Sequence, residues 1–306
     1  MNSHERKFSW MGRGLIVAAA GLALAMVGPG LGEAVAGSPA CPTSITSCGC
    51  AITSAGTYTV ANDLAASQGM TALGDCIDVS VSGVTLNLEG YNVENDNGNG
   101  NVGIHVLKGA SGTTIIGGLD GVNLQSSQVS NVYNLSLSFI EDWNIGLESD
   151  GANTVAGHFV ADYNAIGVLV QKATGNSITG FGSVDNYEYG VWLNGATGSR
   201  VTSSVDAVIN GCQYIGIYLG SNKPDDVGNN PPSGSVPTNN NFINDNIAFD
   251  NFAGVVIDIK SLGNQVMDNV ALYNEYDLTD FNPNCGTNRW VLNVFDSNQE
   301  NPACID

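Results

Sequence analysis

One recurring phrase, a Gly followed by an apolar, any and an apolar residue, limits most strongly what this 306-residue chain can fold into. From about residue 75 to 280, each copy is followed by a turn, an apolar pair and an Asn-rich corner. The copies are spaced 18, 25, 21, 23, 26 and 38 residues apart and begin at Gly103, Gly121, Gly146, Gly167, Gly190, Gly216 and Gly254. A unit of about 20 to 25 residues predicts a solenoid, in which each repeat packs only on its neighbours.

The local period within each phrase decides which solenoid forms. Apolar residues alternate with others in short runs, and the 3.6-residue spacing of helical or leucine-rich repeats is missing. Three short strands and three bends take roughly 22 residues, so that one coil of parallel strands stacks on the next at about 4.8 Å. A left-handed coil would need a stricter hexapeptide repeat. We therefore predict an all-β protein, a single-stranded right-handed parallel β-helix of about nine coils.

The two ends of the chain predict a signal and two caps. Residues 1–36 place basic residues before a weakly apolar run and end on Ala34-Val35-Ala36, which is typical of a secretory signal peptide; a retained membrane anchor is the alternative. We assign 37–74 to an N-terminal cap, 75–280 to the β-helix with a loop insertion at 221–240, and 281–306 to a C-terminal cap. Caps are expected because an open stack exposes strand edges. The mature protein is expected to be secreted, periplasmic or at the cell surface, with no membrane contact after signal removal.

Export accounts for the seven cysteines, because disulfides form in oxidising compartments. We predict that Cys285 pairs with Cys304 and that four N-terminal cysteines form two bridges of undecided connectivity: Cys41, Cys48, Cys50 and Cys76. Cys212 is then a buried free thiol. A zinc cluster at Cys48-Gly49-Cys50 is the competing interpretation, but no His lies nearby.

Charge limits the partners of the mature chain. The whole chain has 29 acidic and 9 basic residues, for a net charge of −20. Such a surface repels polyanions such as pectin or alginate unless calcium bridges them, and it excludes nucleic-acid binding.

The recurring corner asparagines are interpreted as a structural ladder in which Asn adopts a left-handed backbone and hydrogen-bonds to its equivalent in the next coil. They are Asn144, Asn164, Asn186, Asn210, Asn251 and Asn274.

Several segments resemble secreted bacterial proteins of the pectate-lyase-like, right-handed parallel β-helix superfamily. The resemblance covers roughly residues 45–306 and is carried by the Gly-led phrase and by Thr57-Tyr58-Thr59-Val60, Val84-Thr85-Leu86-Asn87-Leu88-Glu89-Gly90-Tyr91 and Cys285-Gly-Thr-Asn-x-Trp290. It implies this fold, whereas the superfamily contains polysaccharide lyases, glycoside hydrolases, tailspikes and adhesins, so that fold does not fix activity. Catalytic signatures of polygalacturonases and of alginate epimerases are not found, apart from an Asp-Asp pair.

Strand alternation predicts which side chains face solvent. In each Gly-led strand the second residue after the Gly should point outward. The expected outward column is His105, Asn123, Glu148, Leu169, Trp192, Tyr218 and Val256, followed by a second column that includes Gln125, Gln171, Asn194 and Asp258, with Lys172 and Lys260 near the strand ends. We predict polysaccharide contact along this face through Trp192 and Tyr218, which can stack on sugar rings, and through His105, Asn194, Asp258 and Lys260. A ladder that only stiffens the rod is the alternative.

The insertion 221–240 is expected to overhang this face, and long loops on a rigid repeat tend to carry function. Asp225 and Asp226 are candidates for an acid/base pair or a calcium site, and the alternative is a solvated polar loop without a chemical role. Glu148 is a further candidate proton donor. No cofactor is expected to be required, and Ca²⁺ is the ion expected at the acidic pair if one binds there. We expect a monomer that binds extracellular polysaccharide and cleaves it as a lyase or glycoside hydrolase if it is an enzyme. The alternative is a non-catalytic structural or adhesive protein of the cell surface.

Overall fold

The computed structural model describes residues 37–118, 138–202, 208–210, 214–222, 228–229, 231–296, 298–299 and 304–305, with only the backbone for 208–210 and 298–299. All of them belong to one compact unit, Leu31–Asp306. The predicted signal peptide 1–36, the Gly121 phrase, Cys212, Asp225 and Asp226 lie outside the described residues. Within the described part, no helix has the length and apolar character needed to cross a membrane.

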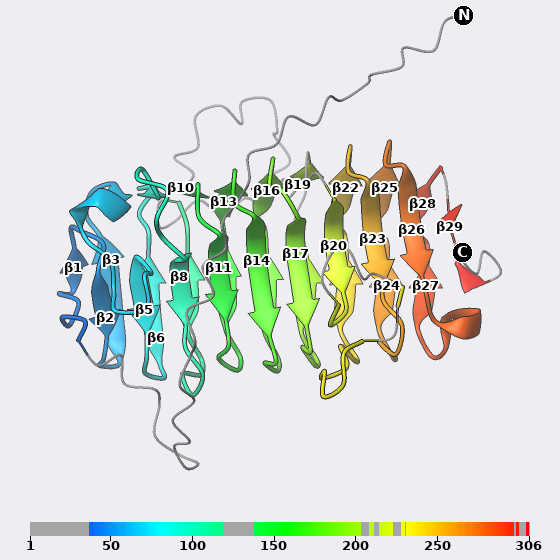
Figure 1. Ribbon diagram of the computed structural model, residues 1–306, viewed down its shortest axis with the longest axis horizontal. Helices are drawn as coiled ribbons and strands as arrows, with labels where there is room; N and C mark the ends of the chain where they lie inside the picture. The colour runs from blue at the N-terminus through cyan, green and yellow to red at the C-terminus, as the bar shows by residue number, and fades with distance from the viewer. Residues whose placement is uncertain are drawn as a thin grey trace, which may run out of the picture. The chain divides into compact units, whose positions relative to one another are not determined.

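Three parallel sheets run side by side along the unit, and each coil contributes one strand to each sheet (Figure 1). Sheet A consists of β2 (Cys50–Ile52), β5 (Ile77–Val79), β8 (Val102–Val106), β11 (Ile145–Ser149), β14 (Ile166–Gln171), β17 (Tyr189–Asn194), β20 (Ile215–Leu219), β23 (Ala253–Ile257), β26 (Tyr276–Asp280) and β29 (Asn298–Gln299).

The other two sheets close the coil. Sheet B consists of β1 (Ser44–Ile45), β3 (Gly56–Val60), β6 (Val84–Asn87), β9 (Thr114–Ile116), β12 (Val155–Gly157), β15 (Ser177–Thr179), β18 (Arg200–Thr202), β21 (Phe242–Asn244), β24 (Gln265–Met267) and β27 (Arg289–Val291). Sheet C consists of β4 (Leu64–Ala65), β7 (Val93–Glu94), β10 (Ser138–Glu141), β13 (Phe159–Asp162), β16 (Gly182–Val184), β19 (Val208–Asn210), β22 (Ile247–Phe249), β25 (Val270–Leu272) and β28 (Val294–Phe295). Two 3₁₀ turns, η1 (Ala66–Gln68) and η4 (Pro283–Cys285), complete the regular structure of the described residues.

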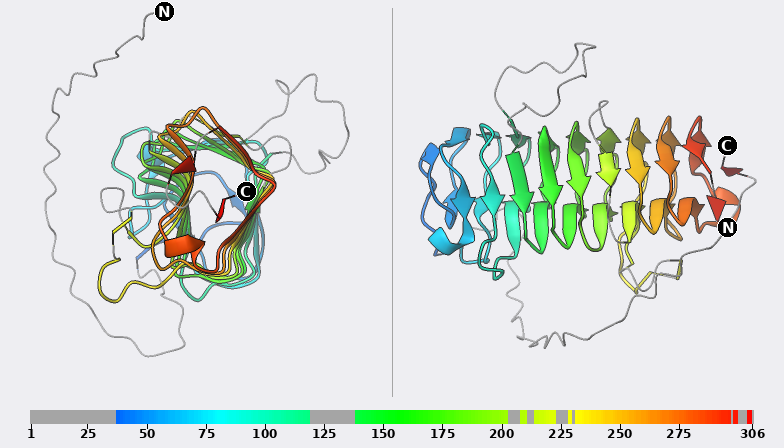
Figure 2. Two further views of the ribbon diagram at one scale, coloured as in Figure 1. Left: turned by 90° about the vertical axis from the view of Figure 1, so that its right-hand side faces the viewer. Right: turned by 90° about the horizontal axis from the view of Figure 1, so that it is seen from above.

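Seen along the stack, successive coils superpose on one another (Figure 2), as expected for a parallel β-helix. Connections between parallel strands are almost always right-handed. The predicted all-β, right-handed parallel β-helix is confirmed. Its stacking already includes β2, β3 and β4 at one end and β27, β28 and β29 at the other, so that coils extend into both segments that the sequence assigns to caps.

The strand that contains Gly103 pairs directly with the strand that contains Gly146. The sequence pattern places a strand beginning at Gly121 between the Gly103 and Gly146 strands. In the structure β8 pairs directly with β11, and β9 pairs directly with β12. No strand of sheet A therefore lies between β8 and β11, and residues 119–137, which include the Gly121 phrase, are outside the described residues. As a result, His105 and Glu148 are cross-strand neighbours.

The predicted alternation of side chains is confirmed in sheet A. The residues on either side of each outward position point inward, and the inner row of Ile104, Leu147, Val168, Val191, Ile217, Val255 and Leu278 is completely buried. Each of these side chains contacts its equivalent in neighbouring coils, so that burial accumulates along the stack rather than within any one coil.

Asparagine ladders hold the corners in register. Asn186 accepts hydrogen bonds at Oδ1 from the backbone and side-chain amides of Asn164, and Asn274 does the same for Asn251. The predicted ladder role of these four residues is confirmed. Their predicted left-handed backbone is wrong, because the positive φ lies one residue earlier, at Tyr163, Asp185, Asp250 and Tyr273. The preceding residue makes the bend, and this leaves the Asn amide free to point along the stack.

Two further ladders, which the sequence analysis did not single out, run through Asn241, Asn264 and Asn288 and through Asn246, Asn269 and Asn293.

Disulfides lie at both ends of the described unit. Cys285 is bonded to Cys304, as predicted. The four N-terminal cysteines form two bridges, and the structure supplies the connectivity that the sequence left open: Cys41–Cys50 and Cys48–Cys76. The bridge from Cys48 to Cys76 links the segment before β2 to the segment before β5, and so ties the first two coils together.

Candidate functional site

The outer face of sheet A carries a single row of in-register side chains. Cross-strand pairing joins Asp78, His105, Glu148, Leu169, Trp192, Tyr218 and Val256, one from each successive strand. The predicted outward column is therefore confirmed for its members from His105 to Val256, whereas Asn123 lies outside the described residues. Neighbouring strands lie about 4.8 Å apart, so that side chains in such a row contact one another.

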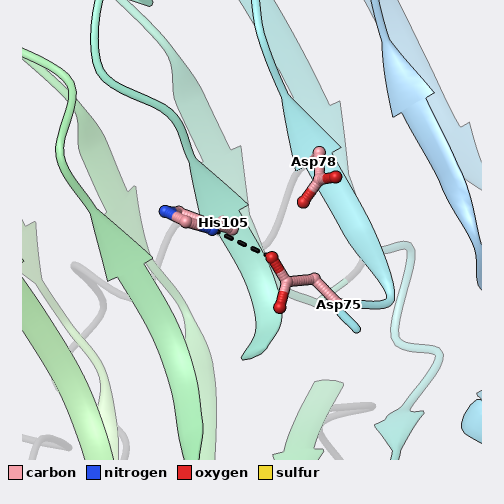
Figure 3. Close-up of side chains that lie close together, drawn as sticks. All are labelled: Asp75, Asp78 and His105. Atoms are coloured by element: carbon pink, nitrogen blue, oxygen red, sulfur yellow. Dashed lines mark hydrogen bonds and ion pairs between the residues drawn. The ribbon is translucent and has the colours of Figure 1, made fainter. Parts of the chain in front are cut away.

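Ionisable groups converge at the N-terminal end of this row. Asp75 lies two residues before β5, Asp78 within β5, His105 within β8 and Glu148 within β11, and Asp150 directly follows β11. We call these five residues the carboxylate–histidine cluster. Asp75, Asp78 and His105 each offer one ligand atom within 4.8 Å of the others, and so do His105, Glu148 and Asp150. His105 is the residue shared by both groups. Figure 3 shows Asp75 and Asp78 on one side of its ring.

Direct contacts fix the orientation of His105. Its Nδ1 lies 2.9 Å from Asp75 Oδ2, and Asp75 Oδ1 in turn accepts a hydrogen bond from the backbone N–H of Val102 at 3.1 Å. Its Nε2 lies 3.9 Å from Asp150 Oδ2, too far for a hydrogen bond. Gln171 Nε2 donates to Glu148 Oε1 at 3.2 Å. The imidazole is therefore held between two sets of carboxylates.

Burial and repulsion between carboxylates raise the pKa values of two acids in the cluster. Burial, together with the neighbouring Asp75 carboxylate, raises the pKa of Asp78 to about 7. Burial also raises the pKa of Glu148 to about 7, with His105 opposing the shift and Asp150 and Asp75 adding to it. Burial alone would lower the pKa of His105, but the Asp150, Asp75 and Glu148 carboxylates raise it to about 10. Carboxyl groups that titrate near neutrality beside an imidazolium can exchange protons or bind cations.

Several polar atoms in the cluster have no hydrogen-bond partner. They are both carboxylate oxygens of Asp78, Nε2 of His105 and Oδ1 of Asp150, all of them buried. Asp78 is 0% exposed and the Asp75 side chain 2% exposed, whereas the side chains of His105 and Asp150 are 13% and 27% exposed. Buried polar groups in native structures are nearly always satisfied, so these atoms call for a ligand, an ion or water.

The aromatic part of the row differs from its prediction. Tyr218 is in the outward column, but it is 0% exposed and therefore is not a surface for sugar stacking. Its ring stacks on buried Tyr189, and its hydroxyl donates to Asp258 Oδ2 at 2.6 Å. Trp192 is half-buried beside them, and its Nε1 donates to Gly220 O. These side chains belong to a second apolar cluster on the outside of sheet A, separate from the interior core.

The insertion explains why this part of the face is covered. Gly228 donates its backbone N–H to Asp258 Oδ1 at 2.8 Å and packs against the ring of Phe281. Asp258, predicted as a substrate contact, is consequently buried and engaged by Tyr218 and Gly228. Lys260 is exposed and lines a pocket with Ser221, Pro232 and Ser235 of the insertion. Asp225 and Asp226 lie outside the described residues, so that their predicted catalytic or calcium-binding role stays a prediction.

A polar strip runs beside the row from the cluster toward Trp192. Asp150 follows β11, and Gln171 and Asn194 are cross-strand partners at the ends of β14 and β17. All three are partly exposed. Asn194, predicted as a substrate contact, is thus accessible next to Trp192.

Asp75, Asp78 and Asp150 were not predicted from the sequence as members of a site. The signal for Asp78 was present, because Cys76-Ile77-Asp78-Val79 has the same apolar–x–apolar pattern as the Gly-led strands without the Gly. Asp150 occupies the position two residues after Glu148, on the same face of the chain. Asp75 lies just before its strand, where no alternation rule applies.

Comparisons with known proteins found the following. No family model matches the sequence, and no curated protein matches it. Among solved structures, the enzymatically active domain of bacteriophage CBA120 tailspike protein 2 is similar, with 15% identity and a TM-score of 0.40 over 81% of this chain. Full-length tailspike protein 2 from Escherichia coli O157:H7 bacteriophage CAB120 is similar at 12% identity, with a TM-score of 0.28 over 81% of this chain. This chain spans only 38% and 34% of the lengths of those two chains.

Proposed function

We propose that this chain is a secreted β-helix that binds polysaccharide along the outer face of sheet A and cleaves it at the carboxylate–histidine cluster. The observation that carries the proposal is the row of Asp78, His105 and Glu148 on three adjacent strands, with Asp150 beside it. A purely structural or adhesive rod has no need of converging ionisable groups on one face. The three disulfides among the described residues support an oxidising, extracellular location.

The polar strip and Trp192 supply the binding surface of this proposal. Gln171 and Asn194 offer side-chain amides that can hydrogen-bond sugar hydroxyls, and the half-buried Trp192 offers a ring held rigidly by its contacts with Tyr189 and Gly220. Sugar rings stack on such aromatic faces. The covered Tyr218 marks where the accessible path ends. Because acidic residues greatly outnumber basic ones, an uncharged or cationic glycan fits this face better than a uronate polymer.

Glu148 and Asp150 are the proposed reactive pair. One carboxylate oxygen of each lies within 4.8 Å of the other. Retaining glycosidases hold their two carboxyl groups about 5–5.5 Å apart, whereas inverting enzymes need about 6.5–9.5 Å to admit a water molecule. We assign the more exposed Asp150 as the nucleophile that forms the glycosyl–enzyme bond. Glu148 then protonates the leaving oxygen and later takes a proton from the water that hydrolyses the intermediate.

The test uses residues 37–306 produced in an oxidising host. Binding is measured on an array of neutral, amino-sugar and acidic polysaccharides, and cleavage by release of reducing ends. We expect the wild-type protein to bind at least one uncharged or amino-sugar polymer, and Trp192→Ala to bind the same polymer more weakly. Glu148→Gln should bind normally while its product release falls by about 100-fold or more, since general acids contribute about 10²–10⁴-fold. Glu275→Gln, an exposed glutamate on another coil, is the matched control and should behave as wild type.

Two outcomes would contradict the proposal. If wild-type protein retains no polysaccharide, glycan binding is wrong and the structural or adhesive alternative is favoured. If it binds a polymer but releases no product, or if Glu148→Gln cleaves as fast as wild type, the assigned cleavage is wrong while binding stands.

A further inference from the structure

The buried half of the carboxylate–histidine cluster has the composition and geometry of an ion site. Asp75, Asp78 and His105 come from the approach to β5, from β5 itself and from β8, and one ligand atom of each lies within 4.8 Å of the others (Figure 3). The separation of 2.9 Å between His105 Nδ1 and Asp75 Oδ2 fits a hydrogen bond. It equally fits two ligands about 2.0–2.1 Å from one ion, which stand about 2.9–3.4 Å apart at right-angled to tetrahedral geometry.

Asp78 supplies an independent indication of a ligand. Its side chain is 0% exposed, it faces Asp75 and His105, and neither of its carboxylate oxygens has a hydrogen-bond partner. A buried carboxylate without a partner is costly, and such groups in proteins are normally paired or coordinate a metal. The adjacent Asp75 carboxylate increases the cost by adding a second negative group.

His105 alone does not satisfy Asp78. Its Nδ1 contacts Asp75, and its Nε2 points to the other side of the ring, where Asp150 Oδ2 lies 3.9 Å away. One imidazole therefore faces carboxylates on both sides, and it gives no hydrogen bond to either carboxylate oxygen of Asp78. An ion between Asp75, Asp78 and Nδ1 would contact all three at once.

The ligand types select the class of ion. Calcium and magnesium prefer shells made only of oxygen, whereas a shell of two carboxylates and an imidazole suits a transition metal such as zinc. Histidines that bind metals usually donate their other ring N–H to a carboxylate, and here Asp150 and Glu148 lie on that side. We propose that Asp75, Asp78 and His105 bind one divalent transition-metal ion, Zn²⁺ in the first instance, with the fourth position open to water.

This inference concerns the same cluster as the proposed cleavage but does not depend on it, because the bound ion can be measured without any polysaccharide. Glu148 and Asp150 would then orient His105 from the opposite side of its ring and remain available to a ligand on the face.

The experiment measures metal binding by tag-free residues 37–306 after chelator treatment and its removal. Zn²⁺, Mn²⁺ and Ca²⁺ are titrated separately by calorimetry, bound metal is counted by elemental analysis, and thermal unfolding is recorded with and without each ion. We expect about one Zn²⁺ per chain, an increase in Tm on binding because the ion stabilises only the folded state, and weaker binding of Ca²⁺.

The variants distinguish this site from weak binding to the acidic surface. Asp78→Asn keeps the shape of the side chain but removes a charged ligand, and it should lose affinity for Zn²⁺ by at least about tenfold together with the Zn²⁺-induced Tm increase. His105→Gln should do the same, so that the conclusion does not depend on one variant. Glu275→Gln should bind like wild type. Wild-type protein without stoichiometric Zn²⁺, Asp78→Asn with wild-type affinity, or tighter binding of Ca²⁺ than of Zn²⁺ would each overturn the assignment.

Discussion

Removing one rung of an asparagine ladder should destabilise the β-helix far more than an ordinary polar substitution. Asn269 is almost completely buried. Its Oδ1 accepts from the backbone and side-chain amides of Asn246 at 3.0 and 2.9 Å, and its Nδ2 donates to Ile243 O, Met267 O and Asn293 Oδ1 at 2.9–3.0 Å. Asn269→Ala deletes all five interactions and adds no clash.

The size of the effect follows from the groups left without partners. The buried N–H of Asn246 loses its acceptor and the carbonyl of Ile243 loses a donor, and each such loss costs about 1–3 kcal/mol. We therefore expect the free energy of unfolding to fall by about 2–6 kcal/mol. Asn62 is the control, because its Nδ2 donates to two exposed carbonyls, and Asn62→Ala should cost less than about 1 kcal/mol.

Urea unfolding, followed by far-UV circular dichroism and by tryptophan fluorescence, measures both variants. Two probes are needed because stacked repeats can unfold in parts, and separated transitions would show a local loss. Trp290 pairs with Val266 of the same region and reports on it. If Asn269→Ala is no less stable than Asn62→Ala, the ladders do not hold the corners in the way described above.

Two further changes test other parts of the structure. Tyr218→Phe removes the hydrogen bond to buried Asp258, and urea titration should show that the free energy of unfolding falls by about 1–3 kcal/mol. Limited digestion should show faster proteolysis within the insertion. Unchanged digestion would mean that this contact does not hold the insertion in place. Burial and the carboxylates of Glu94 and Asp142 raise the pKa of Glu141. The folded chain therefore binds the carboxyl proton of Glu141 more tightly than the unfolded chain does. This contribution to stability is lost as pH rises through the raised pKa of the folded state. Glu141→Gln should therefore raise Tm at pH 7.5 but not at pH 4, and an equal Tm change at both pH values would rule out this electrostatic origin.

The architecture and the outward row could be predicted from the sequence because both depend on local periodicity. The two-residue alternation around His105 and Trp192 fixes which side chains leave the coil, whatever the rest of the chain does. The pairing of strands between coils cannot be predicted from this local periodicity. The Gly121 phrase has the same local pattern as the phrases around it, and only the observed pairing of β8 with β11 shows that His105 lies next to Glu148.

Exposure on the outer face could not be predicted from alternation. Alternation correctly assigns Tyr218 and Asp258 to the outer side of the coil. A side chain on the outer side can still be shielded from solvent by another segment of the chain. Whether the insertion folds over them depends on contacts such as Gly228 with Asp258, which join residues 30 positions apart. Asp75 escaped notice for a similar reason, since it joins the site through its neighbours on another coil rather than through any pattern of its own.

The chemistry of this chain is assembled across its coils, and this restricts how the gene could change in length. Duplicating a coil between β5 and β11 would separate Asp78 from Glu148 by another strand spacing of about 4.8 Å and dismantle the site. Duplicating one between β20 and β26 would add a layer to the stack without touching those groups. The number of coils is therefore constrained between β5 and β11, where the carboxylate–histidine cluster lies, and free to vary between β20 and β26.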